Sequence, residues 1–213
     1  AAVLYRSNAQ SRVIESALLQ FDIPYRVYGG QRFFERLEIK NALAYMRLIL
    51  NCHDDVAFER VVNTPPRGIG ERTVDAVREC ARNNSISMWS AAKAMIVEKN
   101  LNTRSGNALA AFLNLINEMT NTLEALPLSE LAENSIEMSG LIEMHRREKG
   151  ERGQSRVENL EELVGACKNF SPESTDVPVL GQFLDQVSLE AGERQANEDQ
   201  DAVQLMSLHS AKG

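Results

Sequence analysis

Residues 64–73 read TPPRGIGERT, and this stretch decides how the middle of the chain is interpreted. A helical pattern precedes it over residues 58–62, and another follows it over residues 72–82. A helix, a tight Gly-Ile-Gly turn and a second helix form the pattern of a helix-hairpin-helix motif. The stretch therefore predicts a compact helical pair whose turn is exposed.

The turn has the chemistry of a phosphate site. Gly68 and Gly70 let backbone amides approach an anion because no Cβ stands in the way. The helix that follows directs its N-terminal amides and the positive end of its dipole toward the same anion. Arg67 and Arg72 add charge that contacts phosphates without reading bases, and Ile69 anchors the turn in the core. The alternative is a plain helix–helix turn with two capping glycines.

The same helical spacing extends outward from the turn to about residues 33–170. Apolar stripes recur at three- and four-residue intervals, for example at Leu109, Leu113, Ile116, Met119 and Leu123. These stripes predict a mainly α fold, with Trp89 in its core.

The two ends of the chain read differently from its middle. Residues 3–6 and 25–28 are short β-like runs on either side of a helix that we expect Ser7 or Asn8 to cap. Residues 202–208 alternate as a third strand. Strands at both ends and helices between them predict a helical domain inserted into an α/β domain.

Composition narrows the class of protein. The chain has 213 residues, of which 43% are hydrophobic and 25% charged, as in a soluble globular protein. No apolar run approaches the roughly 20 residues that span a bilayer, and the start does not resemble a secretion signal, so we expect a cytoplasmic protein without a membrane partner. The first residue is not Met, which suggests an excised piece. Three widely spaced cysteines predict neither a zinc site nor disulfides.

The net charge of −7 is unevenly distributed. Residues 173–201 carry eight acids and one base, a local −7, whereas residues 145–156 carry five basic and two acidic residues, a local +3. Any nucleic-acid contact must therefore be local. The basic run is either such a contact or a solvated loop. We interpret His53 and His145 as surface residues and residues 192–201 as a mobile linker.

Two further segments offer polar side chains where a strand ends. Arg6, Asn8 and Arg12 follow the first strand and suit phosphates or bases of a single strand, or else belong to a capped surface helix. Residues 207–213 (SLHSAKG) form either an anion-binding loop or a simple strand terminus. No GxxxxGK[ST] loop, catalytic triad, carboxylate pair or metal-ligand set is present, so we predict no catalytic residue and no metal site in this chain.

Five segments in order resemble the UvrD-type superfamily 1 DNA helicases. They are LYRSNAQSR at 4–12, YGGQRFFERLEIKNALAYMRL at 28–48, VVNTPPRGIGERT at 61–73, SRVENLEELV at 155–164 and VQLMSLHSAKG at 203–213. The resemblance implies a fragment of a 3′–5′ helicase of DNA repair and replication, which uses ATP and Mg²⁺ in the parent protein. Residues 1–28 and 202–213 would be pieces of its second RecA-like motor domain. Residues 29–201 would be the accessory 2B subdomain.

The resemblance also implies roles for individual residues. Those on duplex backbone would be Arg67, Gly68, Ile69, Gly70, Arg72 and Thr73. Those on single-stranded DNA would be Arg6, Asn8, Arg12, Ser207 and His209. Gly213 would lie near the nucleotide, and Ser207 keeps the hydroxyl of the family's usual Thr. Because the Walker motifs and the Leu-Glu expected after Gly213 are absent, we expect no cofactor and no ATPase activity in the fragment.

Two alternatives stay open. A protein-interaction module would dock repair proteins through its helical faces, and the acidic stretch at 173–201 favours it. A related nuclease-helicase motor agrees less well with the sequence of residues 8–12 (NAQSR) and 63–70 (NTPPRGIG). Duplex binding through phosphates should weaken steeply with salt, whereas apolar docking should not. The resemblance further predicts hinges near residues 28–31 and 198–203.

Overall fold

The computed structural model describes residues 1–192, 201–208 and 210–212, without the side chain of Asn8. His209, Gly213 and most of the predicted linker at 192–201 lie outside these described residues, as does part of the predicted hinge at 198–203.

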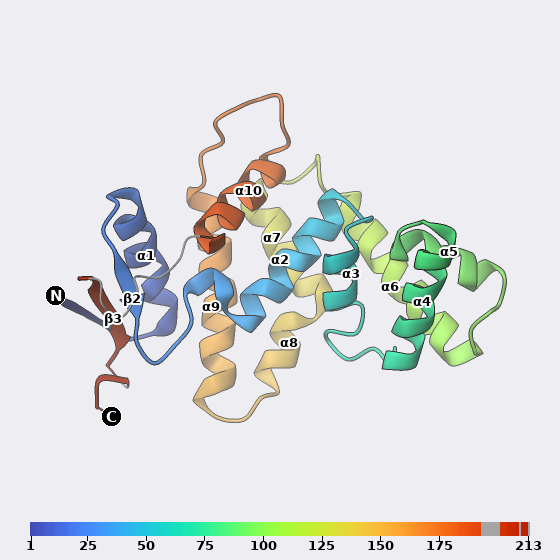
Figure 1. Ribbon diagram of the computed structural model, residues 1–213, viewed down its shortest axis with the longest axis horizontal. Helices are drawn as coiled ribbons and strands as arrows, with labels where there is room; N and C mark the ends of the chain where they lie inside the picture. Colours follow the sequence, from blue (N-terminus) through green and yellow to red (C-terminus); the bar gives the residue numbers. More distant parts are fainter. Residues whose placement is uncertain (193–200, 209, 213) are drawn as a thin grey trace. The chain divides into compact units, whose positions relative to one another are not determined.

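Three strands from the two ends of the chain form one small parallel sheet (Figure 1). They are β1 (Ala2–Tyr5), β2 (Tyr25–Val27) and β3 (Val203–Ser207), in the order β1-β3-β2. β3 therefore lies between two strands that precede it by almost the whole chain, with Ala2 opposite Gln204 and Tyr25 opposite Val203. The strands predicted at both ends are confirmed.

One face of the sheet is covered by α1 (Ser11–Gln20). Tyr5, Tyr25, Val27 and Leu205 are buried there, packed against apolar side chains that include Ile14 and Leu18 of the helix. The predicted cap of this helix is wrong. A 3-10 turn, η1 (Asn8–Gln10), comes first, and the side chain of Gln10 accepts the amides of Arg6 and Ser7 instead.

The rest of the described chain is almost entirely helical, as predicted. After the short turn η2 (Phe33–Glu35), the helices are α2 (Leu37–Leu50), α3 (Asp55–Val61), α4 (Glu71–Asn84), α5 (Met88–Val97), α6 (Thr103–Thr120), α7 (Leu128–Ser139), α8 (Leu141–Arg146), α9 (Glu151–Asn169) and α10 (Val179–Gly192). A last turn, η3 (Ser210–Lys212), follows β3. None of the described helices is long and apolar enough to cross a membrane.

The chain divides into two compact units. The sheet unit comprises residues 1–40 and 145–213, and the hairpin unit comprises residues 41–144. In the hairpin unit α4, α5 and α6 pack in succession, and Trp89 is buried with 2% of its surface exposed, as predicted. Phe58 and Phe112 meet edge to face at 5.5 Å between ring centres. The predicted domain boundaries at 28/29 and 201/202 stay a prediction.

His145 is not the surface residue that the sequence predicts. It is 1% exposed, and its Nδ1 atom lies 2.6 Å from Oε1 of Glu148. Arg156 also bonds Glu148, at 2.6 Å, and faces Glu38 at 3.7 Å. The basic run at 145–156 is thus not a loop throughout: it comprises the end of α8, a turn and the start of α9. Charged neighbours in sequence suggest a surface position, whereas in the structure the His145 ring is buried beside Glu148 of the turn, which Arg156 of α9 also bonds.

Candidate nucleic-acid interface

The Gly-Ile-Gly turn lies between α3 and α4 in the hairpin unit, as the sequence predicts. Ile69 is buried with 1% of its surface exposed, whereas Gly68 and Gly70 on either side of it are exposed. Gly68 has a φ of +80°, a left-handed conformation that favours glycine. The turn is therefore anchored by one apolar side chain and presents the glycine backbone outward.

A single side chain organises the inner side of this turn. The Oδ1 atom of Asn63 accepts the backbone amide of Arg67 at 2.8 Å and that of Ile69 at 3.2 Å. A carboxamide oxygen has two lone pairs, so these two bonds use its full acceptor capacity. Asn63 thereby fixes the path of the chain from residue 63 to residue 69.

Arg67 is directed into the protein. Its Nη1 atom donates to the carbonyls of Val61 and Pro65, at 3.3 and 3.0 Å, and its Nη2 atom donates to the carbonyl of Ser139 at 2.8 Å. The guanidinium carbon also lies 5.6 Å from the ring centre of Phe112. Arg67 thus ties the turn to the C-terminal end of α7 and does not extend from it.

Tyr45 supports the same turn from α2. Its hydroxyl donates to the carbonyl of Thr64 at 2.6 Å, and its ring faces the guanidinium of Arg67, whose central carbon lies 5.7 Å from the ring centre. Tyr45 is fully buried, and this burial raises the pKa of its phenol to about 12, although Arg67 opposes the shift. The phenol therefore stays protonated and keeps donating at neutral pH.

The outer side of the turn has unused donors. Within the described part of the chain, four main-chain amides have no hydrogen-bond acceptor: those of Gly68, Gly70, Glu71 and Arg72. The amides of Thr73 and Val74 are the first of the helix to be bonded, both to the carbonyl of Gly70. Unbonded amides at a helix start are the donors that anions use.

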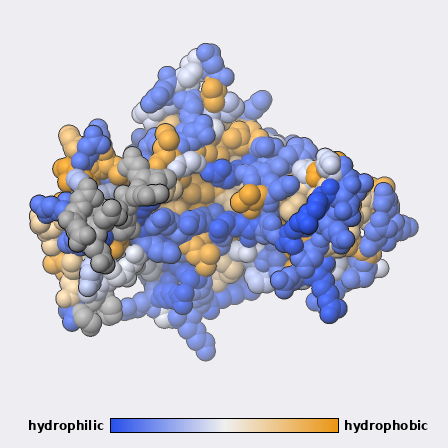
Figure 2. All heavy atoms as spheres, viewed as in Figure 1, coloured by the Kyte–Doolittle hydropathy of each residue, from blue (hydrophilic) through white to orange (hydrophobic). Residues whose placement is uncertain are grey.

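The two other polar residues predicted at the turn differ in accessibility. Arg72 is exposed and makes no ion pair or hydrogen bond through its side chain among the described residues. Thr73 is only 9% exposed, so its side chain faces the protein more than solvent. Over α4 to α6, the face shown in Figure 2 is mostly hydrophilic.

Sequence reasoning missed Arg104. This exposed residue on the first turn of α6 has its Nη2 atom 4.0 Å from the position that a Cβ would take on Gly68. No side-chain hydrogen bond or ion pair engages it in the described chain. An arginine 36 positions further along has no local pattern that connects it with the glycines, so only the packing of α6 beside the turn reveals it.

The residues predicted to bind single-stranded DNA lie in the sheet unit, near the carboxyl ends of β1 and β3. Arg6 is exposed, and Arg12 on α1 donates to Glu162 on α9 at 2.6 Å. Ser207 ends β3, and its hydroxyl accepts the amide of Ser210 at 3.1 Å and lies 2.9 Å from the Ser210 hydroxyl. The side chains of Asn8 and His209 are not among those described.

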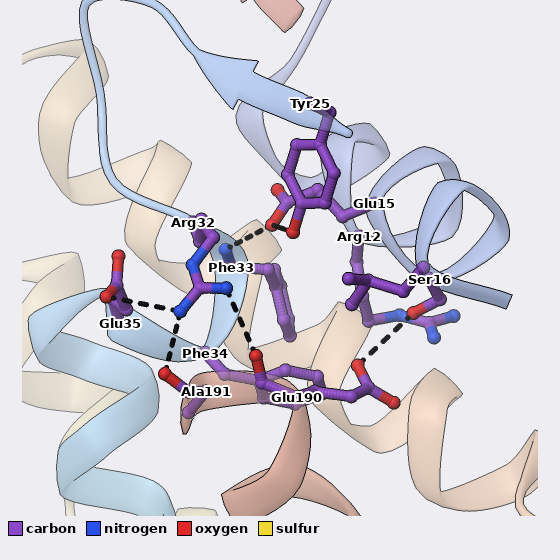
Figure 3. A pocket seen from close by; sticks show the side chains of 11 residues that line it. Arg12, Glu15, Ser16, Tyr25, Arg32, Phe33, Phe34, Glu35, Glu190 and Ala191 are labelled. Carbon is purple, nitrogen blue, oxygen red and sulfur yellow. Dashed lines mark hydrogen bonds and ion pairs between the residues drawn. The ribbon is translucent and has the colours of Figure 1, made fainter. Parts of the chain in front are cut away.

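A small pocket lies beside Arg12 in the sheet unit (Figure 3). Arg32 points into it and donates to the carbonyls of Glu190 and Ala191, at 3.1 and 2.7 Å, near the end of α10. Glu15 accepts the amide of Phe33 at 3.1 Å. The Oε1 atom of Glu15 and the Nε atom of Arg32 are buried without a partner in the described chain. Most of the polar groups that line the pocket are hydrogen-bonded to other residues of the chain, so we interpret it as a packing contact between α1, η2 and α10 and not as a ligand site.

The described chain is mainly helical, returns to a small parallel sheet and exposes a glycine turn whose amides are partly unbonded. Residues 1–213 match the family model described as the UvrD-like helicase C-terminal domain, so the chain belongs to this family.

Individual members of the family are similar to the chain over its whole length. The chain is 55% identical over 214 residues to DNA helicase II of Escherichia coli and 53% identical to DNA helicase II of Haemophilus influenzae. It is 38% identical over 218 residues to the ATP-dependent DNA helicase PcrA of Bacillus subtilis. In each comparison the whole chain is covered, but it spans only 29–30% of the relative's length.

Proposed function

We propose that this chain is the part of an ATP-dependent 3′–5′ DNA helicase that contacts duplex DNA and regulates unwinding. Residues 29–201 would form the accessory 2B subdomain, and residues 1–28 and 202–213 would contribute to the second motor domain. The parent protein would use ATP and Mg²⁺ in DNA repair and replication, and no residue of this chain is assigned a catalytic role.

The observation that carries the proposal is the row of unbonded amides on the exposed side of the turn. Gly70 is exposed, has an ordinary φ of −74°, and a Cβ added to it would meet no atom within 4 Å. A phosphate oxygen can therefore approach the amides of Gly70, Glu71 and Arg72 directly. Such contacts go to the backbone of DNA and carry no sequence preference.

The test is binding of the 213-residue chain to a short fluorescein-labelled duplex, followed by anisotropy over a range of salt. We expect weak binding whose logarithm falls linearly with the logarithm of salt concentration, with a slope of about −0.9 per neutralised phosphate. Gly70→Ala should weaken it about three- to tenfold, because the methyl group obstructs the phosphate.

The matched control is Gly165→Ala on α9, where the nearest atom to an added Cβ is Oε2 of Glu162 at 3.9 Å. This variant adds the same methyl group away from the turn and should bind as the unaltered chain does. Identical affinities for the two variants would remove the turn from the interface. Absence of salt-dependent duplex binding would favour the protein-interaction module instead.

A further inference from the structure

We infer that Asn63 and Arg67 are positioning residues for the Gly68–Gly70 turn, and that Arg104 supplies the cation for the phosphate that the turn receives. This inference rests on the proposed function, and it differs from the sequence-based expectation in the part given to Arg67. It assigns an inner and an outer side to the turn.

The inner side is defined by alternate amides. Those of Arg67 and Ile69 donate to one oxygen of Asn63, whereas those of Gly68 and Gly70 have no acceptor in the described chain. Successive amides in an extended or turning chain point to different sides, so capture of the first pair leaves the second pair directed away from Asn63. Asn63 thereby selects which donors remain available.

Arg67 stabilises the turn from its inner side. Three carbonyls from separate positions, those of Val61, Pro65 and Ser139, accept hydrogen bonds from its two terminal nitrogens. A guanidinium has five N–H groups in a rigid fork, and Arg67 directs this fork at main-chain atoms of its own protein. To reach a phosphate it would have to leave these carbonyls, two of which, Val61 and Pro65, belong to the turn and the helix before it.

Arg104 is placed where Arg67 is not. Its guanidinium lies beside Gly68 on the exposed side, with an Nη2 atom 4.0 Å from the site of a Cβ, and it has no side-chain partner among the described residues. Arginine binds phosphate oxygens with two parallel hydrogen bonds. A phosphate held by the amides of Gly68 and Gly70 would therefore lie within reach of the Arg104 guanidinium, which would break no existing hydrogen bond or ion pair of the described chain to bind it.

The charges around the turn permit this contact. Arg72 and Arg104 are exposed on its outer side, and Glu71 is the acidic residue of the first turn of α4. Arg78, further along α4, is already engaged with Glu59 and Asp75. Arg72, Arg104 and Glu71 together carry one net positive charge. This charge is too small for tight DNA binding, but it suffices for one phosphate contact among several made by a longer protein.

The first test needs no DNA. Amide hydrogen exchange in the 213-residue chain should show protection at Arg67 and Ile69 and fast exchange at Gly68 and Gly70. Asn63→Ala should abolish the protection at both positions, and Asn63→Asp, which keeps an acceptor oxygen, should restore it. If Asn63→Ala leaves the protection of both amides unchanged, or if Gly68 and Gly70 are protected equally, the part assigned to Asn63 is wrong.

The second test separates the two arginines by duplex binding and by thermal unfolding. Arg104→Gln should weaken binding about three- to tenfold at low salt and make the salt slope shallower by about 0.9, with no change in Tm. Arg82→Gln is the matched control, because it removes the same charge from an exposed position near the other end of α4. Arg82→Gln should leave both the duplex affinity and the salt slope unchanged.

Arg67→Gln should lower Tm and weaken binding while the salt slope stays that of the unaltered chain. The opposite pattern, a slope shallower by about 0.9 for Arg67→Gln and an unchanged slope for Arg104→Gln, would overturn the assignment. If Arg67→Gln does not fold, the comparison of Arg104→Gln with Arg82→Gln still decides the part of Arg104. If the unaltered chain shows no salt-dependent binding, the proposed function fails, and the exchange pattern still tests Asn63.

Discussion

The Nε atom of Arg12 on α1 donates to the Oε1 atom of Glu162 on α9 at 2.6 Å, across 150 positions of sequence. Only 14% of the Arg12 side chain and 26% of the Glu162 side chain are exposed. The arginine that the sequence assigns to single-stranded DNA is therefore already paired with a carboxylate. A DNA phosphate would have to compete with Glu162 for it.

Replacing Glu162 by Gln should strengthen binding of single-stranded DNA. The change removes the charge that competes for Arg12, and we expect a gain of about two- to fivefold at low salt, which shrinks as salt rises. Fluorescence anisotropy with a labelled oligonucleotide measures it. Glu161→Gln, at the exposed neighbouring position, removes the same charge without releasing Arg12. Equal gains for both variants would show that net charge alone is responsible.

Gly153→Ala should destabilise the sheet unit. A Cβ at this position on α9 would lie 2.5 Å from the carbonyl oxygen of His145 and 2.8 Å from that of Glu148. Main-chain atoms cannot turn away as side chains do, so the turn between α8 and α9 must shift, at a cost of about 1–3 kcal/mol. Thermal unfolding should show a Tm lower by roughly 3–10 °C. Gly165→Ala on the same helix should leave Tm equal or higher, and a similar fall in both would contradict this reason.

Glu71→Gln should have opposite effects on DNA binding and on stability. Its exposed carboxylate lies at the first position of α4, beside the unbonded amides, where it repels a phosphate but interacts favourably with the helix dipole. We expect duplex affinity to rise about two- to threefold at low salt and stability to fall by about 0.3–1 kcal/mol. Glu79→Gln, exposed on the same helix, is the control. A variant that binds no better than this control would argue against a phosphate at the helix start.

The hairpin unit should lose stability in alkali. Burial raises the pKa of Tyr45 from 10.0 to about 12, so the unfolded chain gives up this proton before the folded chain does. This contribution to the free energy of unfolding is complete below pH 10 and is lost as the pH rises from about 10 to about 12; it is on the order of 3 kcal/mol. Tm measured over this range should fall steadily.

Tyr45→Phe tests the origin of that fall. The variant loses the hydrogen bond to Thr64 and should be less stable by about 1 kcal/mol at neutral pH, but its Tm should decline less steeply above pH 10. Part of the decline will remain, because burial also raises the pKa of Tyr5, Tyr25 and Cys167. A decline as steep as that of the unaltered chain would show that Tyr45 does not contribute.

Local patterns were enough to predict most elements of the fold. The stripe that contains Val77 and Ala81 predicts α4, and both residues are buried on it at 1% and 5% exposure. The alternation at residues 202–208 predicts β3, and the glycines predict an exposed turn with Ile69 inward. Each of these features repeats, or is anchored, within a few positions of the chain, so neighbouring residues suffice to indicate it.

Partners distant in sequence could not be predicted in this way. His145 has charged neighbours in sequence, yet it is buried, with its Nδ1 atom 2.6 Å from Glu148, which Arg156 on the next helix also bonds. Arg67 follows two prolines and precedes a glycine, a setting that suggests an outward cation, yet carbonyls up to 72 positions away hold it inside. The direction of a long side chain depends on which acceptors packing brings within reach.

The sequence by itself determined the helical middle, the strand-forming ends and the exposed glycine turn, because hydrophobic periodicity and glycine conformation act over a few residues. Only the tertiary structure decided that Asn63 captures alternate amides, that Arg67 serves the protein interior, and that Arg104 stands beside Gly68. The last two relationships join the turn to α7 and α6, which are distant in sequence and come close only after the apolar stripes have packed together. Asn63 acts within the turn itself, but the direction of its side chain follows no periodic pattern in the sequence.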